Sequence, residues 1–227
     1  MRTRTAMLVS AGAVVAALGA ARPCRRRGTR PLFSWWYGAL ARRADQGEIG
    51  RRRQRLVGQA SGRVLDLGAG TGESFKHIPA TVRELVALEP DPAMLRQARP
   101  RTGETSVAVR IVQGASEQLP FATATFDTVV ACLVLCSVRD LDVTVAEIHR
   151  VLRPGGRLLL MEHVRAADEA LAEWQDLVQR PWSWLNGGCH PNRPTVAAIQ
   201  DAGFRFATLE HYGFPVLPHV EGSAVRP

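Results

Sequence analysis

The chain has 227 residues, enough for one well-filled α/β core, and we expect one catalytic domain with an extension. Its formal net charge of +8 is unevenly spread. Residues 1–60 hold 13 arginines against two acidic residues, whereas the other 167 residues hold 16 basic and 19 acidic ones, so the main part of the chain is not predicted to bind nucleic acid.

The first element is an uncharged run of small apolar residues, AMLVSAGAVVAALGAA at 6–21, flanked on both sides by arginines. It is shorter than the ~20 residues that a membrane-spanning helix usually needs. It has the form of a signal peptide, but the arginines that follow would hinder export and predict that the C-terminal side stays in the cytoplasm. Two interpretations of residues 1–30 stay open. They are a weak anchor giving peripheral contact with the cytoplasmic face of the membrane, or a disordered extension of a cytoplasmic protein.

Residues 31–60 contain two short segments with helical spacing of apolar residues, PLFSWWYGALARRA and GEIGRRRQRLVGQA. We expect them to pack on the edge of a sheet. Alternatively, the aromatic cluster Phe33, Trp35, Trp36 and Tyr37 covers a substrate pocket. They begin the predicted catalytic domain, residues 31–227.

From residue 62 onward, short β-rich runs alternate with stretches of helical periodicity. The runs are RVLDLG, ELVALEP, VAVRIVQG, FDTVVACL and GRLLLMEHV, and the stretches between them are GESFKHIP, DPAMLRQARP and LDVTVAEIHRVLRPGG. Such alternation predicts an α/β fold, a doubly wound and mostly parallel sheet preceded by the N-terminal helices. Ligands of these sheets bind at the carboxyl ends of the strands.

The loop VLDLGAGTGESF at 64–75 follows the first predicted strand. Gly68, Gly70 and Gly72 let a ligand lie against the backbone, and a helix after the loop would present free N–H groups. A dinucleotide loop reads GxGxxG, whereas this one reads GxGxG with Asp66 two positions before its first glycine. A carboxylate there suits a ligand with a positive ammonium group and would oppose a pyrophosphate. An unoccupied tight turn is the alternative.

Two further segments lie where the second and third strands are expected to end. Glu89, in ALEPDPAML, can accept two hydrogen bonds from ribose hydroxyls. Asp91 is predicted to be the N-cap of the next helix. The segment VQGASEQLPF at 112–121 places Ala115 and Ser116 where an adenine edge would lie.

The chain resembles the class I S-adenosylmethionine-dependent methyltransferases over residues 32–227. The motifs that carry the resemblance are VLDLGAGTG, LEPDPAML, GASEQLPF, FDTVVACLVLCSV and EIHRVLRPGGRLLLMEH. It implies a Rossmann-like fold, S-adenosyl-L-methionine as the cofactor and methyl transfer to a small-molecule acceptor. The residues that it assigns to the cofactor are Asp66, Gly68, Ala69 and Gly70 for the methionine part, Glu89 for the ribose, Pro90, Ala115 and Ser116 for the adenine, and Cys132 beneath the sulfonium.

The segments LVLCSV, EHVRA, GGCHPNR and AGF more narrowly resemble the small membrane-associated thiol methyltransferases, which are close to the ubiquinone/menaquinone methyltransferases. This resemblance implies a small, hydrophobic acceptor, with a thiol as the first candidate and a quinone, lipid or other small molecule methylated on oxygen, carbon or nitrogen as alternatives. A dinucleotide-dependent enzyme and a catalytically silent cofactor-binding module are the alternatives of other classes.

The stretch GGCHPNRPT at 187–195 places Cys189 beside His190. A zinc site needs three or four protein ligands and no other pair in the chain has the same spacing, so we predict no metal and reduced thiols. We expect residues 165–192 to form a helical insertion over the active site. Its apolar stripe would be Leu171, Trp174, Leu177 and Val178.

The corner GGCH would bring Cys189, His190 and Arg193 over the cofactor. Alternatively, Arg193 and Thr195 only begin the next helix. A free thiol has a pKa near ~8.5 and is mostly protonated at neutral pH, so a thiol acceptor would benefit from a nearby base. His163 and His190 are the candidate bases.

Overall fold

The computed structural model describes residues 31–214 and 216–227. The extension at residues 1–30, with its predicted membrane contact, therefore lies outside the described residues. The side chains of residues 31–37 also lie outside the description, and with them the aromatic cluster that could cover a pocket. Within the described ranges, no helix combines the length and the apolar character needed to cross a bilayer.

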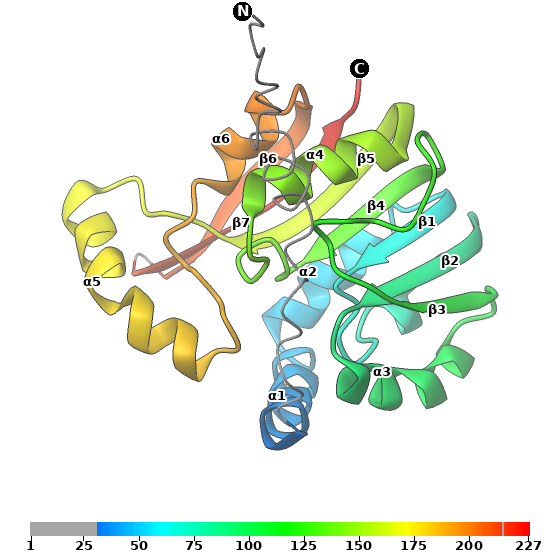
Figure 1. Ribbon diagram of the computed structural model, residues 1–227, viewed down its shortest axis with the longest axis horizontal. Coiled ribbons are helices and arrows are strands. Elements are labelled where there is room, and N and C mark those ends of the chain that lie inside the picture. The colour runs from blue at the N-terminus through cyan, green and yellow to red at the C-terminus, as the bar shows by residue number, and fades with distance from the viewer. Residues whose placement is uncertain (1–30, 215) are drawn as a thin grey trace, which may run out of the picture.

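A seven-stranded sheet with strand order β3-β2-β1-β4-β5-β7-β6 forms the centre of the molecule (Figure 1). The strands β1 to β5 are parallel, and β7 runs antiparallel between β5 and β6. The sequence order reverses between β1 and β4, which confirms the predicted doubly wound, mostly parallel α/β fold. The strands are β1 (Gly62–Leu67), β2 (Val82–Glu89), β3 (Val109–Gln113), β4 (Phe126–Cys132), β5 (Leu152–His163), β6 (Arg205–Phe214) and β7 (Leu217–Val225).

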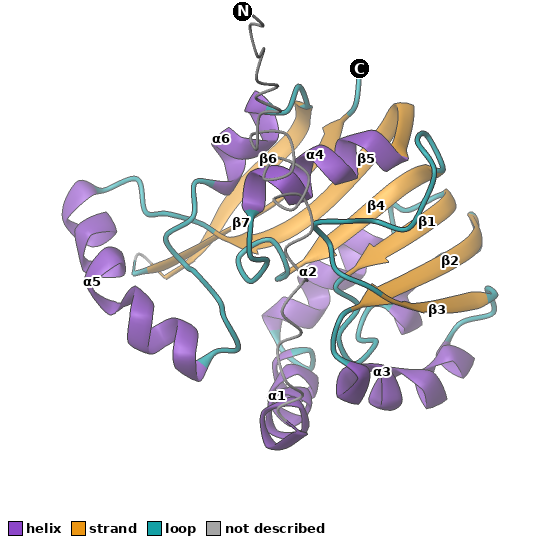
Figure 2. Ribbon diagram, viewed as in Figure 1, coloured by secondary structure: helices purple, strands orange, loops and turns teal. Residues whose placement is uncertain are grey.

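Helices cover both faces of this sheet (Figure 2). On one face, Ile148 of α4 and Ile199 of α6 pack into a fully buried cluster with strand residues. On the other face, Val57 of α2, Phe75 and Ala98 of α3 form a second cluster. The helices are α1 (Pro31–Ala44), α2 (Glu48–Val57), α3 (Pro92–Ala98), α4 (Leu141–Val151), α5 (Glu169–Leu185) and α6 (Thr195–Asp201), with short 3₁₀ helices at Phe75–His77 and Arg99–Glu104.

Two local predictions were wrong. The segment GESFKHIP forms only the 3₁₀ helix Phe75–His77, because three glycines with positive φ precede it and β2 begins shortly afterwards, at Val82. The segment LRPGG was predicted to end the helical stretch LDVTVAEIHRVLRPGG, but α4 ends at Val151. LRPGG instead lies within β5, where Gly155 has φ +76° and the register with β4 shifts.

The helix α5 lies outside both layers and is joined to them by two loops (Figure 1). Its predicted stripe is not its buried face, because Trp174 and Leu177 are exposed whereas Ala172 and Gln175 are buried. The fully buried Gln175 accepts a hydrogen bond from the Ala166 amide at 2.8 Å and donates to the carbonyls of Val164 and Pro191, both at 3.3 Å. A polar side chain thus ties this helix to both connecting loops.

Candidate active site

The carboxyl ends of three neighbouring strands bring the predicted site residues to one edge of the sheet. Leu67 at the end of β1 pairs with Leu88 of β2 and with Ala131 of β4. Glu89 and Cys132 each follow those partners by one residue, so both lie beside the glycine loop. Residues far apart in the sequence are therefore brought together by strand register alone.

The glycine loop has a crowded position and an open one. Gly68 has φ +63°, and a Cβ there would lie 2.3 Å from Cγ2 of Val134. Gly70 has φ +55°, but the nearest atom to a Cβ there would be the Gly68 oxygen at 3.9 Å. A side chain at Gly68 would collide with the β4 loop. At Gly70 the space is open, so a ligand can lie against the bare backbone.

Asp66 is a buried carboxylate with unused hydrogen-bonding capacity. It is 2% exposed, and its Oδ2 has no hydrogen-bond partner among the described residues. The Ser74 hydroxyl donates to the carboxylate. Burial raises the pKa of Asp66 to about 7, although the nearby Arg53 charge opposes that rise. An unsatisfied buried acceptor is costly, so this oxygen is suited to a donor that arrives with a ligand.

Arg53 is a site residue that sequence reasoning missed. It lies on α2, is 8% exposed and pairs through Nε with Oδ1 of Asp45 at 3.0 Å. Its charge also acts on Asp66 and Cys132, which places a cation and a carboxylate in one buried region. The sequence does indicate that Arg53 faces the core, because it falls on the helical stripe that contains Ile49 and Leu56.

Glu89 links the glycine loop to the end of β2. Its Oε2 accepts from the Gly70 amide at 3.1 Å, and its Oε1 accepts from the Asp91 amide at 2.9 Å. Burial raises the pKa of Glu89 to about 7. A carboxylate has about four acceptor sites, so further hydrogen bonds can form. The prediction for Asp91 is confirmed, since its side chain caps α3 by accepting from the Ala93 amide at 2.7 Å.

The remaining predicted cofactor residues border the same edge. Ala115 and the buried Ser116 follow β3, and the Gly114 amide donates to the Glu89 carbonyl at 3.4 Å. Pro90 is exposed next to them. Burial raises the pKa of Cys132 to about 12, so this thiol stays protonated at neutral pH.

The loop after β4 is held by Glu162 and Arg193. The buried Glu162 carboxylate accepts from the amides of Val134 at 2.7 Å, Leu135 at 2.8 Å and Cys136 at 3.2 Å. The Arg193 guanidinium donates to the carbonyls of Leu135 and Val138. Arg193 is therefore committed to this loop rather than open to a ligand, and α6 begins at Thr195 as the alternative interpretation expected.

The two candidate bases have different surroundings. His163, at the end of β5, has its Nδ1 3.6 Å from Sγ of Cys189, and its ring centroid is 4.3 Å from that of His219. His190 has its Nδ1 2.7 Å from the Gly188 carbonyl. A neutral imidazole that donates from Nδ1 keeps its lone pair on Nε2. Of the adjacent pair Cys189 and His190, only Cys189 contacts His163.

Comparison with known proteins decides the family. A methyltransferase domain matches residues 65–160. The human thiol S-methyltransferase TMT1A is 34% identical over 172 residues, which cover 72% of this chain and 70% of that protein. The chain belongs to this family of S-adenosylmethionine-dependent methyltransferases.

Other relatives extend the comparison. The ubiquinone/menaquinone biosynthesis C-methyltransferase UbiE of Escherichia coli is 31% identical, covering 66% of this chain and 68% of that protein. An S-adenosylmethionine-dependent methyltransferase structure from Thermotoga maritima superposes with a TM-score of 0.64 at 18% identity, covering 86% of this chain and 98% of that one. The predicted fold and enzyme class of this methyltransferase are confirmed.

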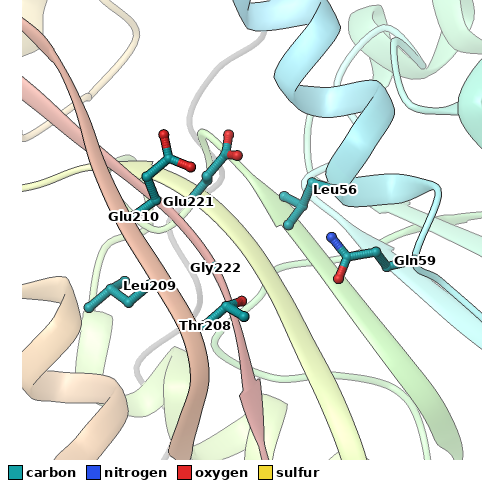
Figure 3. Close-up of a pocket in the computed structure, with 7 residues that line it drawn as sticks. All are labelled: Leu56, Gln59, Thr208, Leu209, Glu210, Glu221 and Gly222. Carbon is teal, nitrogen blue, oxygen red and sulfur yellow. The ribbon is translucent and has the colours of Figure 1, made fainter.

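A shallow hollow elsewhere on the methyltransferase does not involve these residues. It lies between α2, β6 and β7 (Figure 3), and its lining consists of Leu56, Gln59, Thr208, Leu209, Glu210, Glu221 and Gly222. Arg52 pairs with Glu210 at 3.0 Å and with Glu221 at 3.2 Å. The carboxylates of the hollow thus anchor α2 to the sheet, and no predicted site residue lines it.

Proposed function

We propose that this methyltransferase transfers the methyl group of S-adenosyl-L-methionine to the sulfur of a small, hydrophobic thiol. The observation that carries the cofactor assignment is the unsatisfied Oδ2 of Asp66 beside the charge of Arg53 and the open face of Gly70. An amino-acid ligand has an ammonium and a carboxylate group. Opposite charges buried side by side fit such a zwitterion, whereas a pyrophosphate would be repelled by Asp66.

The other parts of the cofactor fit the same edge. Glu89 has acceptor sites left for two ribose hydroxyls, and Pro90, Ala115 and Ser116 lie beyond it for the adenine. Cys132, with its neutral thiol, would lie beneath the sulfonium without competing as a nucleophile. Once bound, the cofactor supplies a methyl group on a positively charged sulfur.

The thiol acceptor is supported by the similarity to TMT1A, which is named as a thiol S-methyltransferase. The match to UbiE, named as a C-methyltransferase, keeps a quinone as the second candidate. The exposed Trp174, Leu177 and Trp184 give α5 an apolar surface, which favours a hydrophobic acceptor.

The residues of the chain act by positioning and by moving a proton. In-line methyl transfer needs the acceptor sulfur aligned with the donor and water kept out. Glu162 and Arg193 fix the loop after β4, which borders the acceptor side. His163 or His190 would take the thiol proton, since a thiolate is the better nucleophile.

Incubation with methyl-labelled S-adenosylmethionine and a panel of alkyl thiols, phenols, quinols and lipids tests this function. Mass spectrometry should find the label on thioether products, with Asp66→Asn abolishing turnover. Labelled phenols or quinols without labelled thioethers would overturn the thiol assignment. Cofactor binding without any product would indicate the silent module.

We infer that residues 31–227 form the catalytic domain and that residues 1–30 give peripheral contact with the cytoplasmic face of the membrane. Partition of the full chain and of a variant lacking residues 1–30 between vesicles and buffer would test the membrane contact. Equal partition of both would contradict it.

A further inference from the structure

Two cysteines and a histidine from three distant parts of the chain meet at the carboxyl end of the sheet. Cys136 lies in the loop after β4, His163 ends β5 and Cys189 lies in the loop after α5. Their ligand atoms all lie within 4.8 Å of one another. Both cysteines are buried, at 1% and 4% exposure, whereas His163 is partly exposed. We propose that Cys136, His163 and Cys189 bind a zinc ion through three protein ligands.

The distance between two of the three ligand atoms agrees with tetrahedral zinc. Zinc–sulfur bonds of about 2.3 Å and zinc–nitrogen bonds of about 2.05 Å at tetrahedral angles place a sulfur and a nitrogen about 3.6 Å apart. The observed distance from Sγ of Cys189 to Nδ1 of His163 is 3.6 Å. Two thiolates and an imidazole are the donor types that zinc prefers, and hard cations such as Mg²⁺ prefer oxygen.

Groups that can interact with sulfur surround the cluster. The side chains of Cys136 and Cys189 lie within hydrogen-bonding distance of each other. Arg193, already fixed on the loop carbonyls, lies close enough to interact with both sulfurs. The buried indole N–H of Trp182 lies near Cys189 and has no hydrogen-bond partner among the described residues. Such outer contacts are typical of metal-bound thiolates.

The backbone around the cluster is already fixed by contacts that leave the three ligand atoms facing one another. Glu162 holds the amide of Cys136, and the Cys136 carbonyl accepts from the His190 amide at 2.7 Å. The amide of Arg165 donates to the Arg193 carbonyl at 3.0 Å, which joins the two loops that flank α5. A site of this kind needs little rearrangement to accept an ion.

Three ligands leave the fourth zinc position open, as in catalytic zinc sites. This deepens the proposed function and rests on it. Cys132, beneath the proposed donor, is the last residue of β4 and precedes Cys136 by four residues. Because His163 would then be a zinc ligand, a thiol acceptor would lose its proton to His190 or to solvent and bind the open position as a thiolate. Its sulfur then bonds to the methyl carbon as the bond from that carbon to the sulfonium sulfur breaks, which gives a thioether and S-adenosylhomocysteine.

Metal analysis of the full chain, purified under reducing conditions without chelators, tests the site itself. About one zinc per chain should remain after dialysis. Cobalt replacement should give thiolate-to-metal charge-transfer bands. Cys136→Ser, Cys189→Ser and His163→Gln should each weaken metal binding by more than about 100-fold, because changes to outer contacts alone cost 10–100-fold.

Matched controls are Cys132→Ser and His190→Gln, which remove a thiol and an imidazole outside the cluster and should keep the zinc. Circular dichroism of each variant separates metal loss from misfolding. Absence of zinc and of cobalt bands in the folded wild type would overturn the proposal. So would a Cys136–Cys189 disulfide recovered by non-reducing mass spectrometry of protein that cannot be metallated after reduction.

A second set of measurements tests whether the zinc ion binds the thiol acceptor. An alkyl thiol should shift the cobalt bands of the wild type, whereas the matching alcohol should not, and Cys189→Ser should lose thiol turnover with unchanged S-adenosylmethionine affinity. Zinc bound without such a shift would overturn the acceptor role alone. Thiol methylation by zinc-free protein would overturn it too and leave the proposed function standing.

Discussion

The Oε2 atom of Glu89 accepts a hydrogen bond from the Gly70 amide at 3.1 Å, which joins the end of β2 to the glycine loop after β1. The carboxylate proposed to hold the ribose therefore also fixes the loop proposed to hold the methionine part. Glu89→Gln should weaken S-adenosylmethionine binding by about 1.5–3 kcal/mol, roughly 10- to 150-fold, because hydrogen bonds to a charged group are lost. Isothermal calorimetry measures this change.

Glu84→Gln is the matched control for Glu89→Gln. Glu84 lies on the same strand and pairs with Arg63 at 2.8 Å, away from the loop. Its variant should bind the cofactor as the wild type does. Equal affinity of the two variants would count against the ribose assignment.

The ionisation of Asp66 should make cofactor binding depend on pH. Burial raises the pKa of Asp66 to about 7, but a bound ammonium group favours the carboxylate. Affinity should therefore rise between about pH 5.5 and 7, and binding in that range should release protons. Calorimetry in buffers of different ionisation enthalpy reports the release. Asp66→Asn should bind weakly with less pH dependence, and an affinity that falls over this range would speak against an ionised Asp66.

Asp66 and Glu89 should also make the stability of the cofactor-free protein depend on pH. Burial raises the pKa values of both Asp66 and Glu89 to about 7, above the ordinary values of 3.8 and 4.5. Between those values the folded state binds more protons than the unfolded state, so the free energy of unfolding should fall as pH rises from about 4 to 7. Urea denaturation at several pH values measures this slope. The double variant Asp66→Asn with Glu89→Gln should have a flatter profile than the wild type, and an unchanged slope would refute the assignment.

Gly68 should be far less tolerant of a side chain than Gly103. At Gly68, a Cβ meets Val134 at 2.3 Å and φ is +63°, whereas nothing lies within 4 Å of a Cβ at Gly103. Gly68→Ala should cost about 1–3 kcal/mol of the free energy of unfolding, while Gly103→Ala should be near neutral. Thermal and urea denaturation compare the two. Equal effects would mean that the loop after β4 can move aside.

Gly70→Ala should separate binding from stability. The space beside Gly70 is open, so only its φ of +55° opposes a side chain in the free protein. A methyl group there would occupy the room proposed for the cofactor. We expect S-adenosylmethionine affinity to drop by more than the free energy of unfolding does, as calorimetry and denaturation of one sample would show.

The glycine loop, the position of Glu89 and the mostly parallel sheet were predictable, because hydrophobic alternation indicates the strands and the register then fixes which loop meets which strand. The 3₁₀ helix at Phe75–His77 was not, since the conformations of the preceding glycines depend on packing against Val134 and Phe75. The burial of Arg53 was not predicted, because an arginine on an amphipathic helix usually keeps its charged end in solvent.

The cluster of Cys136, His163 and Cys189 could not be predicted from the spacing of these residues in the sequence. Successive members are 27 and 26 residues apart, so only the pairing of β4 with β5 and the path of the loop after α5 bring them together. Local spacing led to Cys189 with His190, whose side chains face different partners. The buried Gln175 is a similar case, because a polar residue on an exposed helix gives no sign that it joins two loops.

A crystal structure of this methyltransferase with S-adenosylhomocysteine tests the central claim most directly. The ammonium group should lie within hydrogen-bond distance of Oδ2 of Asp66, and the ribose hydroxyls should lie on Glu89. A nucleoside bound elsewhere, or bound here with Asp66 and Glu89 both free of contact to it, would contradict the account.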